Sequence, residues 1–303
     1  MDLKEPKTFD EQIDKLIEHG CAFMDRAQAV KTLKQANYYR LSAYFLPFKE
    51  RDNSTYKAGT NFEKIYDIYE FDQRIAILLY GLIEEIEVFI KTQIAYQHSM
   101  KYGAVGYLDP NNFISSKAEK HQNLINIFQN ELKNNKDILF VKHHNENYDG
   151  KFPLWVAVEL FTMGNISQFY SQMKGCDKKS VCKNITELTG YTYQYYQLES
   201  LLFCLTYLRN KCAHFSRLYY FKFGTIPKYP IYVTQKINID NNNIRLYQYL
   251  HILRLLSPNP KRWNEFVTEL EAIMDEYSDS ISLAHIGFPE NWRSELTSPL
   301  TEI

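Results

Sequence analysis

The sequence has little of several features that common protein classes need. Its 303 residues include only 11 Gly and 10 Pro, which disfavours a turn-rich all-β fold and a collagen-like or linker-rich chain. The five cysteines are odd in number and form no CxxC pair, so reduced thiols of a cytoplasmic protein are expected. The longest nearly apolar run covers residues 75–83, far short of the roughly 20 residues that a membrane helix needs. We therefore expect no membrane partner.

Motifs of several enzyme classes are also missing. The chain has no GxxxxGK[ST], GxGxxG, HExxH or GxSxG, so nothing indicates a phosphate-binding loop, a zinc protease or a serine hydrolase. The adjacent His143 and His144 have no carboxylate or cysteine at ligand spacing, which favours a polar loop over a metal site. The N-terminal MDLKEPKTFDEQ lacks the apolar core of a signal peptide. No metal and no other cofactor is expected.

The chain as a whole carries no excess of either charge. It has 35 Lys and Arg against 36 Asp and Glu, so the net charge of −1 does not indicate a nucleic-acid partner. This balance is a cancellation, because residues 200–239 hold six basic residues and no acid, whereas residues 263–303 hold nine acids and one Arg. An acid-free basic segment favours a phosphate-bearing ligand, and a solvated basic face is the alternative.

Helix signals cover most of the chain. Thr8 and Glu11 form a capping box for a first helix, and Asp25 can cap a second. Apolar residues at near-heptad spacing predict one long amphipathic helix over residues 61–101. Further helices are expected over 116–136, 153–164 (broken at Gly164, with another following to Lys174), 177–188, 197–219, 245–256 and 263–277.

The remaining segments complete the predicted organisation. Residues 142–151 are polar and loop-like, and 221–239 favours a short hairpin or an extended segment. Aromatic residues reach 15% of the chain, which suits either core packing, the favoured interpretation, or stacking on bases. We predict an all-α fold with an N-terminal helical subdomain over 1–50 and one helical domain over 51–303.

One side of the predicted long helix gathers polar groups. At 100° per residue, Glu84, Glu87, Lys91 and His98 all fall opposite Leu82. Two carboxylates, an ammonium and an imidazole would thus share one side of the helix. A salt-bridged solvent surface is the favoured interpretation, and a site is the alternative.

Residues 197–219 carry the most informative pattern. Apolar residues recur there at spacings of three and four, as in the core of a helical bundle: Leu198, Leu201, Leu205, Leu208, Cys212 and Phe215. Arg209, Asn210 and His214 share the polar side, and Asn210 and His214 are i,i+4 neighbours that can touch. Arg209 lies about 140° from His214, so the two would converge only through the long arginine side chain, a helix end or a symmetry mate.

The spacing of Arg and His by itself is weak evidence. A second match runs from Arg245 to His251 on a plainer helix, and we interpret that one as a chance occurrence. Asn directly after Arg, a strongly patterned helix and the basic surroundings distinguish the first match.

Several stretches, taken in order, resemble the Abi-like (abortive infection, AbiD/AbiF-type) bacterial proteins. They are residues 37–48 (NYYRLSAYFLPF), 69–96, 106–113 (GYLDPNNF), 153–164 (PLWVAVELFTMG), 207–218 (YLRNKCAHFSRL) and 287–292 (GFPENW). That family is assigned to the HEPN superfamily, whose mark is an Arg, a polar residue, several residues and a His. The matching residues here are Arg209, Asn210 and His214. The chain departs from the family pattern at Glu85, Lys91 and Phe215.

The resemblance implies an all-α HEPN bundle, usually dimeric, that acts as a metal-independent endoribonuclease and phage-defence toxin. His214 would serve as general base or acid, Arg209 would hold the phosphate, and Asn210 would orient His214 or bind a phosphate oxygen. Glu87 and Lys91 would support them. The further residues expected to contact RNA are Lys211, Arg217, Arg40 and Tyr39. A small antitoxin RNA can restrain such toxins. The alternatives are a non-catalytic RNA-binding module and a purely structural bundle.

Overall fold

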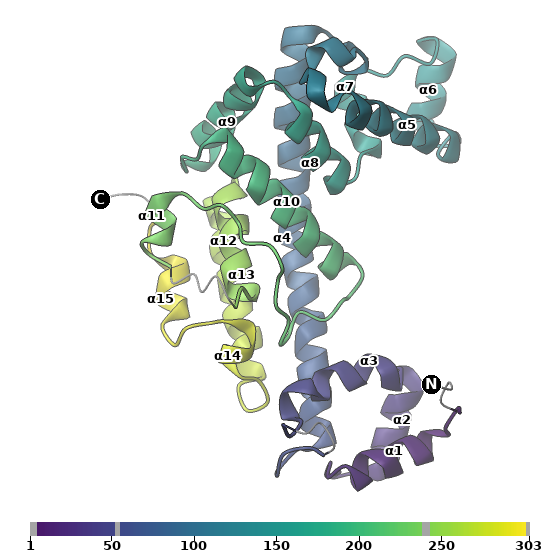
Figure 1. The fold of residues 1–303 in the computed structure, drawn as a ribbon, viewed down its shortest axis with the longest axis vertical. Coiled ribbons are helices and arrows are strands. Elements are labelled where there is room, and N and C mark those ends of the chain that lie inside the picture. Colours follow the sequence, from purple (N-terminus) through teal and green to yellow (C-terminus); the bar gives the residue numbers. More distant parts are fainter. Residues whose placement is uncertain (1–4, 52–54, 238–242, 301–303) are drawn as a thin grey trace.

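The computed structural model describes residues 5–51, 55–237 and 243–300. Over these ranges the chain forms α-helices joined by 3-10 turns and loops, with no β-strand. The predicted all-α class is therefore confirmed. Figure 1 gives the helix labels used below.

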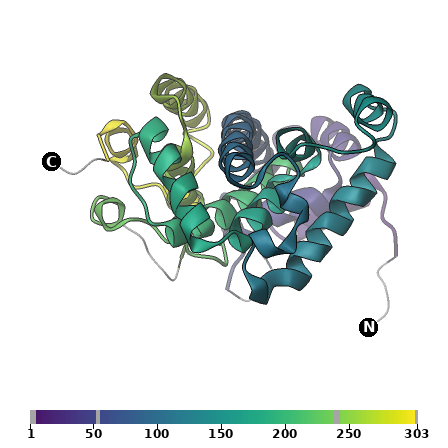
Figure 2. The ribbon, with the colours of Figure 1, turned by 90° about the horizontal axis from the view of Figure 1, so that it is seen from above.

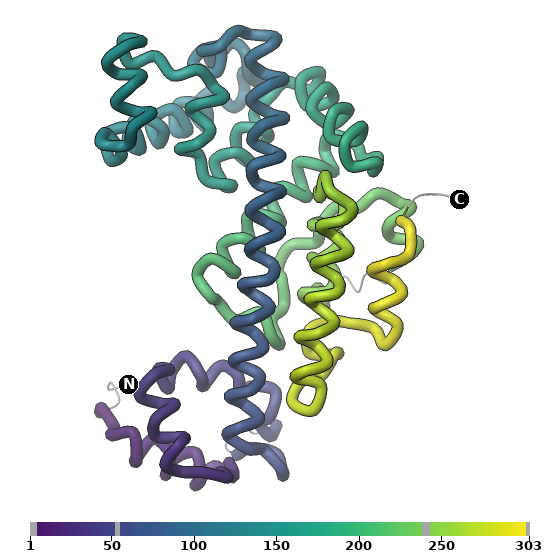
Figure 3. The backbone as a smooth tube through the Cα atoms, turned by 180° about the vertical axis from the view of Figure 1, so that it is seen from behind, coloured from purple at the N-terminus to yellow at the C-terminus, as the bar shows by residue number. Residues whose placement is uncertain are grey.

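One long helix, α4 (Phe62–Tyr102), organises the molecule. The side chain of Asn61 caps its beginning by accepting the backbone N–H of Lys64 at 3.0 Å. Its 41 residues extend about 60 Å at 1.5 Å per residue, and the helix passes along the length of the molecule in Figures 1 and 3. The predicted apolar stripe is buried, with Ile68, Leu82 and Ile86 fully enclosed.

The N-terminal helices cluster at the beginning of α4 (Figures 1 and 3). They are α1 (Phe9–Glu18), α2 (Arg26–Gln35), α3 (Tyr38–Ser42) and the 3-10 helix η1 (Ala43–Phe48). The capping box of Thr8 and Glu11 is present, and Asp25 accepts the N–H of Gln28, so both predicted caps are confirmed. The ring of Phe23 stacks on that of Phe62 with centroids 5.1 Å apart, which attaches the cluster to α4.

Short helices surround the other end of α4. They are η2 (Gly106–Leu108), η3 (Pro110–Asn112), η4 (Ser115–Lys117), α5 (Ala118–Asn134), α6 (Leu139–Asn147), α7 (Leu154–Ala157), η5 (Val158–Leu160), α8 (Met163–Gln172) and α9 (Gly175–Thr189). The predicted loop over 142–151 is wrong, because α6 covers much of it and buries Val141. The break predicted at Gly164 is also misplaced, since Thr162 caps a helix that already contains this glycine.

Helix α10 (Tyr195–Ala213) packs against α4 and runs in the opposite direction, since Arg209 meets Glu87 and the following Leu218 meets Asp72. Its predicted apolar seam is core up to Cys212: Leu198, Leu201, Leu205, Leu208 and Cys212 are at most 1% exposed. The helix ends six residues before the predicted Tyr219, so Phe215 lies outside the seam and is 39% exposed.

The C-terminal helices complete the bundle. They are α11 (Ile231–Thr234), α12 (Leu246–Leu256), α13 (Pro260–Glu276), α14 (Leu283–Ile286) and α15 (Trp292–Thr297). Every residue of α12 is buried, which makes it a central core helix. Helices α13 and α4 are both seen nearly end-on in Figure 2, so they run roughly along the same axis.

The segment before α12 is extended and does not form the predicted hairpin. Residues 221–230 make no strand pairing, and one helical turn, α11, follows them. Pro227 and Pro230 lack the backbone N–H groups that a strand ladder needs, which accounts for the difference. The last part of the predicted hairpin, residues 238 and 239, lies outside the described residues.

Candidate functional site

The final turn of α10 carries the three motif residues. Arg209 faces α4 with its side chain 24% exposed, whereas Asn210 and His214 are exposed to solvent. His214 is the C-cap residue of the helix, and its backbone N–H donates to the Asn210 carbonyl at 3.1 Å. The end of the helix therefore presents the imidazole outward.

An ion-pair cluster joins Arg209 to α4. The Nε atom of Arg209 lies 3.3 Å from Oε2 of Glu87, and the Nζ atom of Lys91 lies 3.0 Å from Oε1 of the same carboxylate. The side chains of Glu87 and Lys91 are only 12% and 14% exposed. The guanidinium carbon also lies 5.7 Å from the ring centroid of Tyr80. These contacts fix Arg209, and within the described residues its two Nη groups make no hydrogen bond, which leaves four N–H donors for an anion.

Within the described residues no hydrogen bond joins the side chains of Arg209 and His214. On a regular helix, side chains five positions apart point about 140° away from each other. In the described part of the chain the imidazole of His214 makes no hydrogen bond or ion pair, so it has no side-chain hydrogen bond to Asn210. The structure therefore brings Arg209, Glu87 and Lys91 together, whereas no hydrogen bond or ion pair of the described residues joins His214 or the Asn210 side chain to them.

The backbone after His214 turns sharply in a Schellman motif. The N–H of Ser216 donates to the Lys211 carbonyl at 2.8 Å, and the N–H of Phe215 donates to the Cys212 carbonyl at 3.0 Å. Phe215 has φ of 46°, the left-handed conformation that glycine usually supplies. A guanidinium N–H of Arg40, on α3, donates to the Phe215 carbonyl. The N-terminal helices thus reach the turn that carries the motif histidine.

A buried carboxylate holds the next residues of the same loop. Asp72 on α4 accepts the N–H of Leu218 at 2.9 Å, the N–H of Tyr219 at 2.8 Å and the hydroxyl of Tyr44 at 2.7 Å. Burial raises the pKa of Asp72 to about 6, and these three hydrogen bonds act in the opposite direction. Asp72 is not among the site residues predicted from the sequence. One signal was present, because this acid lies four residues after Ile68 on the apolar side of the predicted helix.

The basic residues expected to bind RNA are partly occupied within the chain. The ammonium of Lys211 lies 3.6 Å from the ring centroid of Phe221, and Nη1 of Arg217 donates to the Ala43 carbonyl at 3.1 Å. Burial lowers the pKa of both groups. Tyr39, by contrast, is 85% exposed next to Arg40. Tyr39 is thus more exposed than Lys211 and Arg217, which are both half-buried.

The predicted polar side of α4 divides into separate environments. Glu84 is exposed, whereas Glu87 faces α10. His98 is buried among aromatic rings, including Phe113 and Phe169, and burial lowers its pKa to about 4. Sharing one side of a long helix does not place these groups in one site, because successive turns of α4 meet different neighbours.

The second Arg and His pair is structural. His251 is fully buried in α12, and burial lowers its pKa to about 3. Arg245 is also buried, and its Nη1 donates to the His285 carbonyl at 3.1 Å. This agrees with the interpretation of that match as a chance occurrence.

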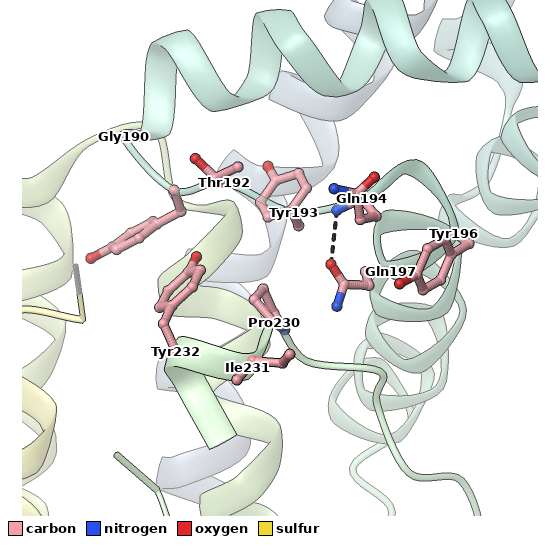
Figure 4. A pocket seen from close by; sticks show the side chains of 10 residues that line it. Gly190, Thr192, Tyr193, Gln194, Tyr196, Gln197, Pro230, Ile231 and Tyr232 are labelled. Carbon is pink, nitrogen blue, oxygen red and sulfur yellow. Dashed lines mark hydrogen bonds between the residues drawn. The ribbon is translucent and has the colours of Figure 1, made fainter. Parts of the chain in front are cut away.

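Among the cavities along α4 and α10, two differ in their distance from the motif. One, of about 520 Å³, is lined by residues 190–194, 196–197 and 230–232, including Tyr191, Tyr193, Tyr196 and Tyr232 (Figure 4). Tyr196 stands 13 residues before Arg209 on α10, about 20 Å along the axis, so this cavity is remote from the motif. The other, of about 360 Å³, is lined by Lys91, Tyr96 and Trp155 and adjoins the ion-pair cluster.

Across residues 5–51, 55–237 and 243–300, no three His, Cys, Asp or Glu side chains are grouped as a metal site requires. Within the same ranges, none of the helices has an apolar stretch long enough to cross a bilayer.

Comparison with known proteins identifies the family. No curated protein and no solved structure gave a significant match. A family model described as Abi-like protein matches residues 31–220, more than half of the chain, and this range includes the ion-pair cluster, Asp72 and the motif helix. The chain therefore belongs to the Abi-like protein family, which implies a role in abortive infection, a form of phage defence.

Proposed function

We propose that this Abi-like protein is a metal-independent endoribonuclease of the HEPN type, close to the AbiD/AbiF proteins, that acts as a phage-defence toxin. The main support is the ion pair between Glu87 and Arg209, since it fixes a guanidinium whose Nη donors remain available to a phosphate. The exposed His214 at the end of the same helix supplies an imidazole, the side chain that most often serves as a general acid or base.

The proposed reaction is attack of an RNA 2′-hydroxyl on the adjacent phosphate. The bond between the 2′-oxygen and phosphorus forms while the bond to the 5′-oxygen breaks. A base removes the 2′-hydroxyl proton, an acid protonates the leaving 5′-oxygen, and His214 serves in one of these roles. Arg209 stabilises the charge that develops on the phosphate, and Asn210 binds a phosphate oxygen or orients His214. The products are a 2′,3′-cyclic phosphate and a 5′-hydroxyl.

A homodimer would account for the separation of Arg209 and His214. Two motifs facing each other across one cleft would place the Arg209 of one copy near the His214 of the other. The same separation favours the second candidate, a module that binds RNA without cutting it. In that function Tyr39 would stack on a base and Arg209 would hold a phosphate. A small antitoxin RNA is a further proposed partner of either form.

One experiment separates these functions. Purified protein is incubated with single-stranded RNA in EDTA, alongside His214→Ala and Arg209→Ala. We expect cleavage that resists the chelator and is lost in both variants. Binding without cleavage by the unmodified protein would support the module, and cleavage that persists in His214→Ala would overturn the proposed mechanism.

The chain offers close controls for both variants. Arg262 is also a half-buried arginine, 25% exposed, and it binds a glutamate of α4, Glu85, at 2.8 Å. Arg262→Ala therefore removes an ion pair to the same helix, together with pairs to Glu265 and Glu269 on α13, without changing the motif. His143, exposed on α6, is the matched histidine. Cleavage should persist in Arg262→Ala and in His143→Ala.

A further inference from the structure

The turn after His214 adopts a conformation that its own sequence does not favour. Phe215 has φ of 46°, in the left-handed region that side-chain-bearing residues rarely occupy. Glycine or asparagine is the usual residue at this position of a Schellman motif. Contacts from elsewhere in the fold must therefore hold Phe215 in place, because such a conformation persists only where its surroundings determine it.

Arg40 supplies such a contact. Its guanidinium donates to the Phe215 carbonyl although 175 positions separate the two residues in sequence. The ring of Tyr69 on α4 lies 5.8 Å from the guanidinium carbon, so the arginine is supported from a second side. Phe215 itself is 39% exposed, and its side chain does little to anchor the turn.

The next residues of the loop are held by the same part of the molecule. Arg217 donates to the Ala43 carbonyl, and Tyr44 donates to the Asp72 carboxylate that accepts the N–H groups of Leu218 and Tyr219. Helix α3 and the 3-10 helix η1 thus hold both ends of the loop. The direction in which His214 leaves α10 depends on the backbone immediately after it.

We propose that Arg40 is a positioning residue for His214. By holding the Phe215 carbonyl it stabilises the left-handed turn, and the turn sets the orientation of the imidazole. This inference rests on the proposed function of His214, and it gives Arg40 a role different from the RNA contact expected from sequence.

A glycine at position 215 provides the discriminating test. Glycine occupies the left-handed region without steric cost, so a turn made with glycine no longer needs Arg40. We expect Arg40→Met to raise hydrogen exchange of the Phe215 and Ser216 amides about tenfold. In the Phe215→Gly background the same substitution should change exchange less than about threefold. Equal effects of Arg40→Met in both backgrounds would overturn the inference.

RNA cleavage gives an independent measurement of the same coupling. A positioning role predicts that Arg40→Met lowers kcat about tenfold or more with little change in KM, and that Phe215→Gly restores much of the loss. A direct phosphate contact predicts the opposite: a raised KM, a smaller salt dependence of binding and no rescue by glycine. That second pattern would contradict the positioning role.

Two further variants serve as controls for a general effect on the N-terminal helices or on folding. Arg26→Met alters an arginine of the same N-terminal cluster that binds Asp10 and Asp14, and it should leave exchange at 215 and 216 unchanged. Arg40→Lys keeps one donor for the carbonyl, so its amide exchange at positions 215 and 216 should lie between that of the unmodified protein and that of Arg40→Met. This variant keeps the test valid even if Arg40→Met folds poorly. If the unmodified protein cleaves no RNA, the nuclease proposal fails, while the exchange measurements still decide whether Arg40 holds the turn.

Discussion

The carboxylate of Glu87 on α4 binds the guanidinium of Arg209 on α10 across 122 positions of the sequence, with Oε2 and Nε 3.3 Å apart. Since Lys91 binds the other oxygen at 3.0 Å, one nearly buried anion orders two cations. Removing the negative charge would leave both cations facing an uncharged amide.

Glu87→Gln should therefore loosen Arg209 while leaving the motif itself intact. We expect RNA cleavage to fall about 100-fold, because a misplaced charge-stabilising group costs about that much. The free energy of unfolding should fall by about 1–2 kcal/mol, since two partly buried cations lose their partner. Steady-state cleavage and urea denaturation measure the two effects. Glu85→Gln, which alters an exposed partner of Arg262, should change stability by less than about 0.5 kcal/mol. Equal losses of cleavage and stability in Glu87→Gln and Glu85→Gln would contradict the role of Glu87 in fixing Arg209.

Asp72→Ala should destabilise the protein strongly. It removes the acceptor of two buried backbone N–H groups, those of Leu218 and Tyr219, and leaves the hydroxyl of Tyr44 without its partner. We expect a loss of about 3 kcal/mol in the free energy of unfolding, measured by urea denaturation. Asp67→Ala on the same helix removes one partly buried bond to Ser280 and should cost about 1 kcal/mol. A loss below 1 kcal/mol for Asp72→Ala would show that the loop is held by other means.

The buried His251 should make stability depend on pH. Burial lowers its pKa to about 3 in the folded state, whereas the unfolded chain takes up this proton near pH 6.5. The unfolded state thus binds more protons below pH 6.5, so the contribution of His251 is full above that pH and declines as the pH falls. Between pH 6.5 and 5 the loss is about 2 kcal/mol.

His251→Leu should remove this part of the acid sensitivity. Urea denaturation at pH 7, 6 and 5 should show the variant losing about 2 kcal/mol less than the unmodified protein over that range. His143→Leu, at an exposed position on α6, is the control and should follow the unmodified protein. Parallel pH profiles for His251→Leu and the unmodified protein would contradict the prediction.

Tyr39 should contribute to RNA affinity through its ring. Because it is 85% exposed, Tyr39→Ala removes little packing, and loss of one stacked base should weaken binding by about 1–3 kcal/mol. The slope of affinity against salt concentration should not change, since no charge is removed. Titration of RNA into the His214→Ala background measures binding without cleavage. Unchanged affinity would show that Tyr39 does not contact the RNA.

Local patterns allowed the helices that carry the site to be predicted. The caps at Thr8 and Asp25 and the seams of α4 and α10 depend on neighbours in sequence, and the structure contains them. The end of α10 was placed too late because the turn at Phe215 has no glycine to mark it. The helix α6 was missed because its single buried residue, Val141, gives too little periodicity.

The contacts between distant segments could not be predicted. Nothing in the sequence near Arg40 or Phe215 indicates that they meet, because the meeting depends on how the N-terminal cluster packs on α4. The same holds for Asp72, whose partners Tyr44 and Leu218 come from opposite sides of it in the sequence. His98 shows the converse: helix geometry predicted that it lies on a polar side, but the rings of Phe113, in a loop, and Phe169, on α8, cover it.

The hydrogen bond from Arg40 to the Phe215 carbonyl also limits when, during synthesis of the chain, the site can form. During synthesis α3 leaves the ribosome first, and its partner follows 175 residues later. At 5–20 residues per second that interval is about 9–35 s. A chain still attached to the ribosome before residue 219 lacks the turn, the Asp72 bonds and the oriented imidazole together. The proposed toxin is thus assembled in its working form only after most of the polypeptide has been made.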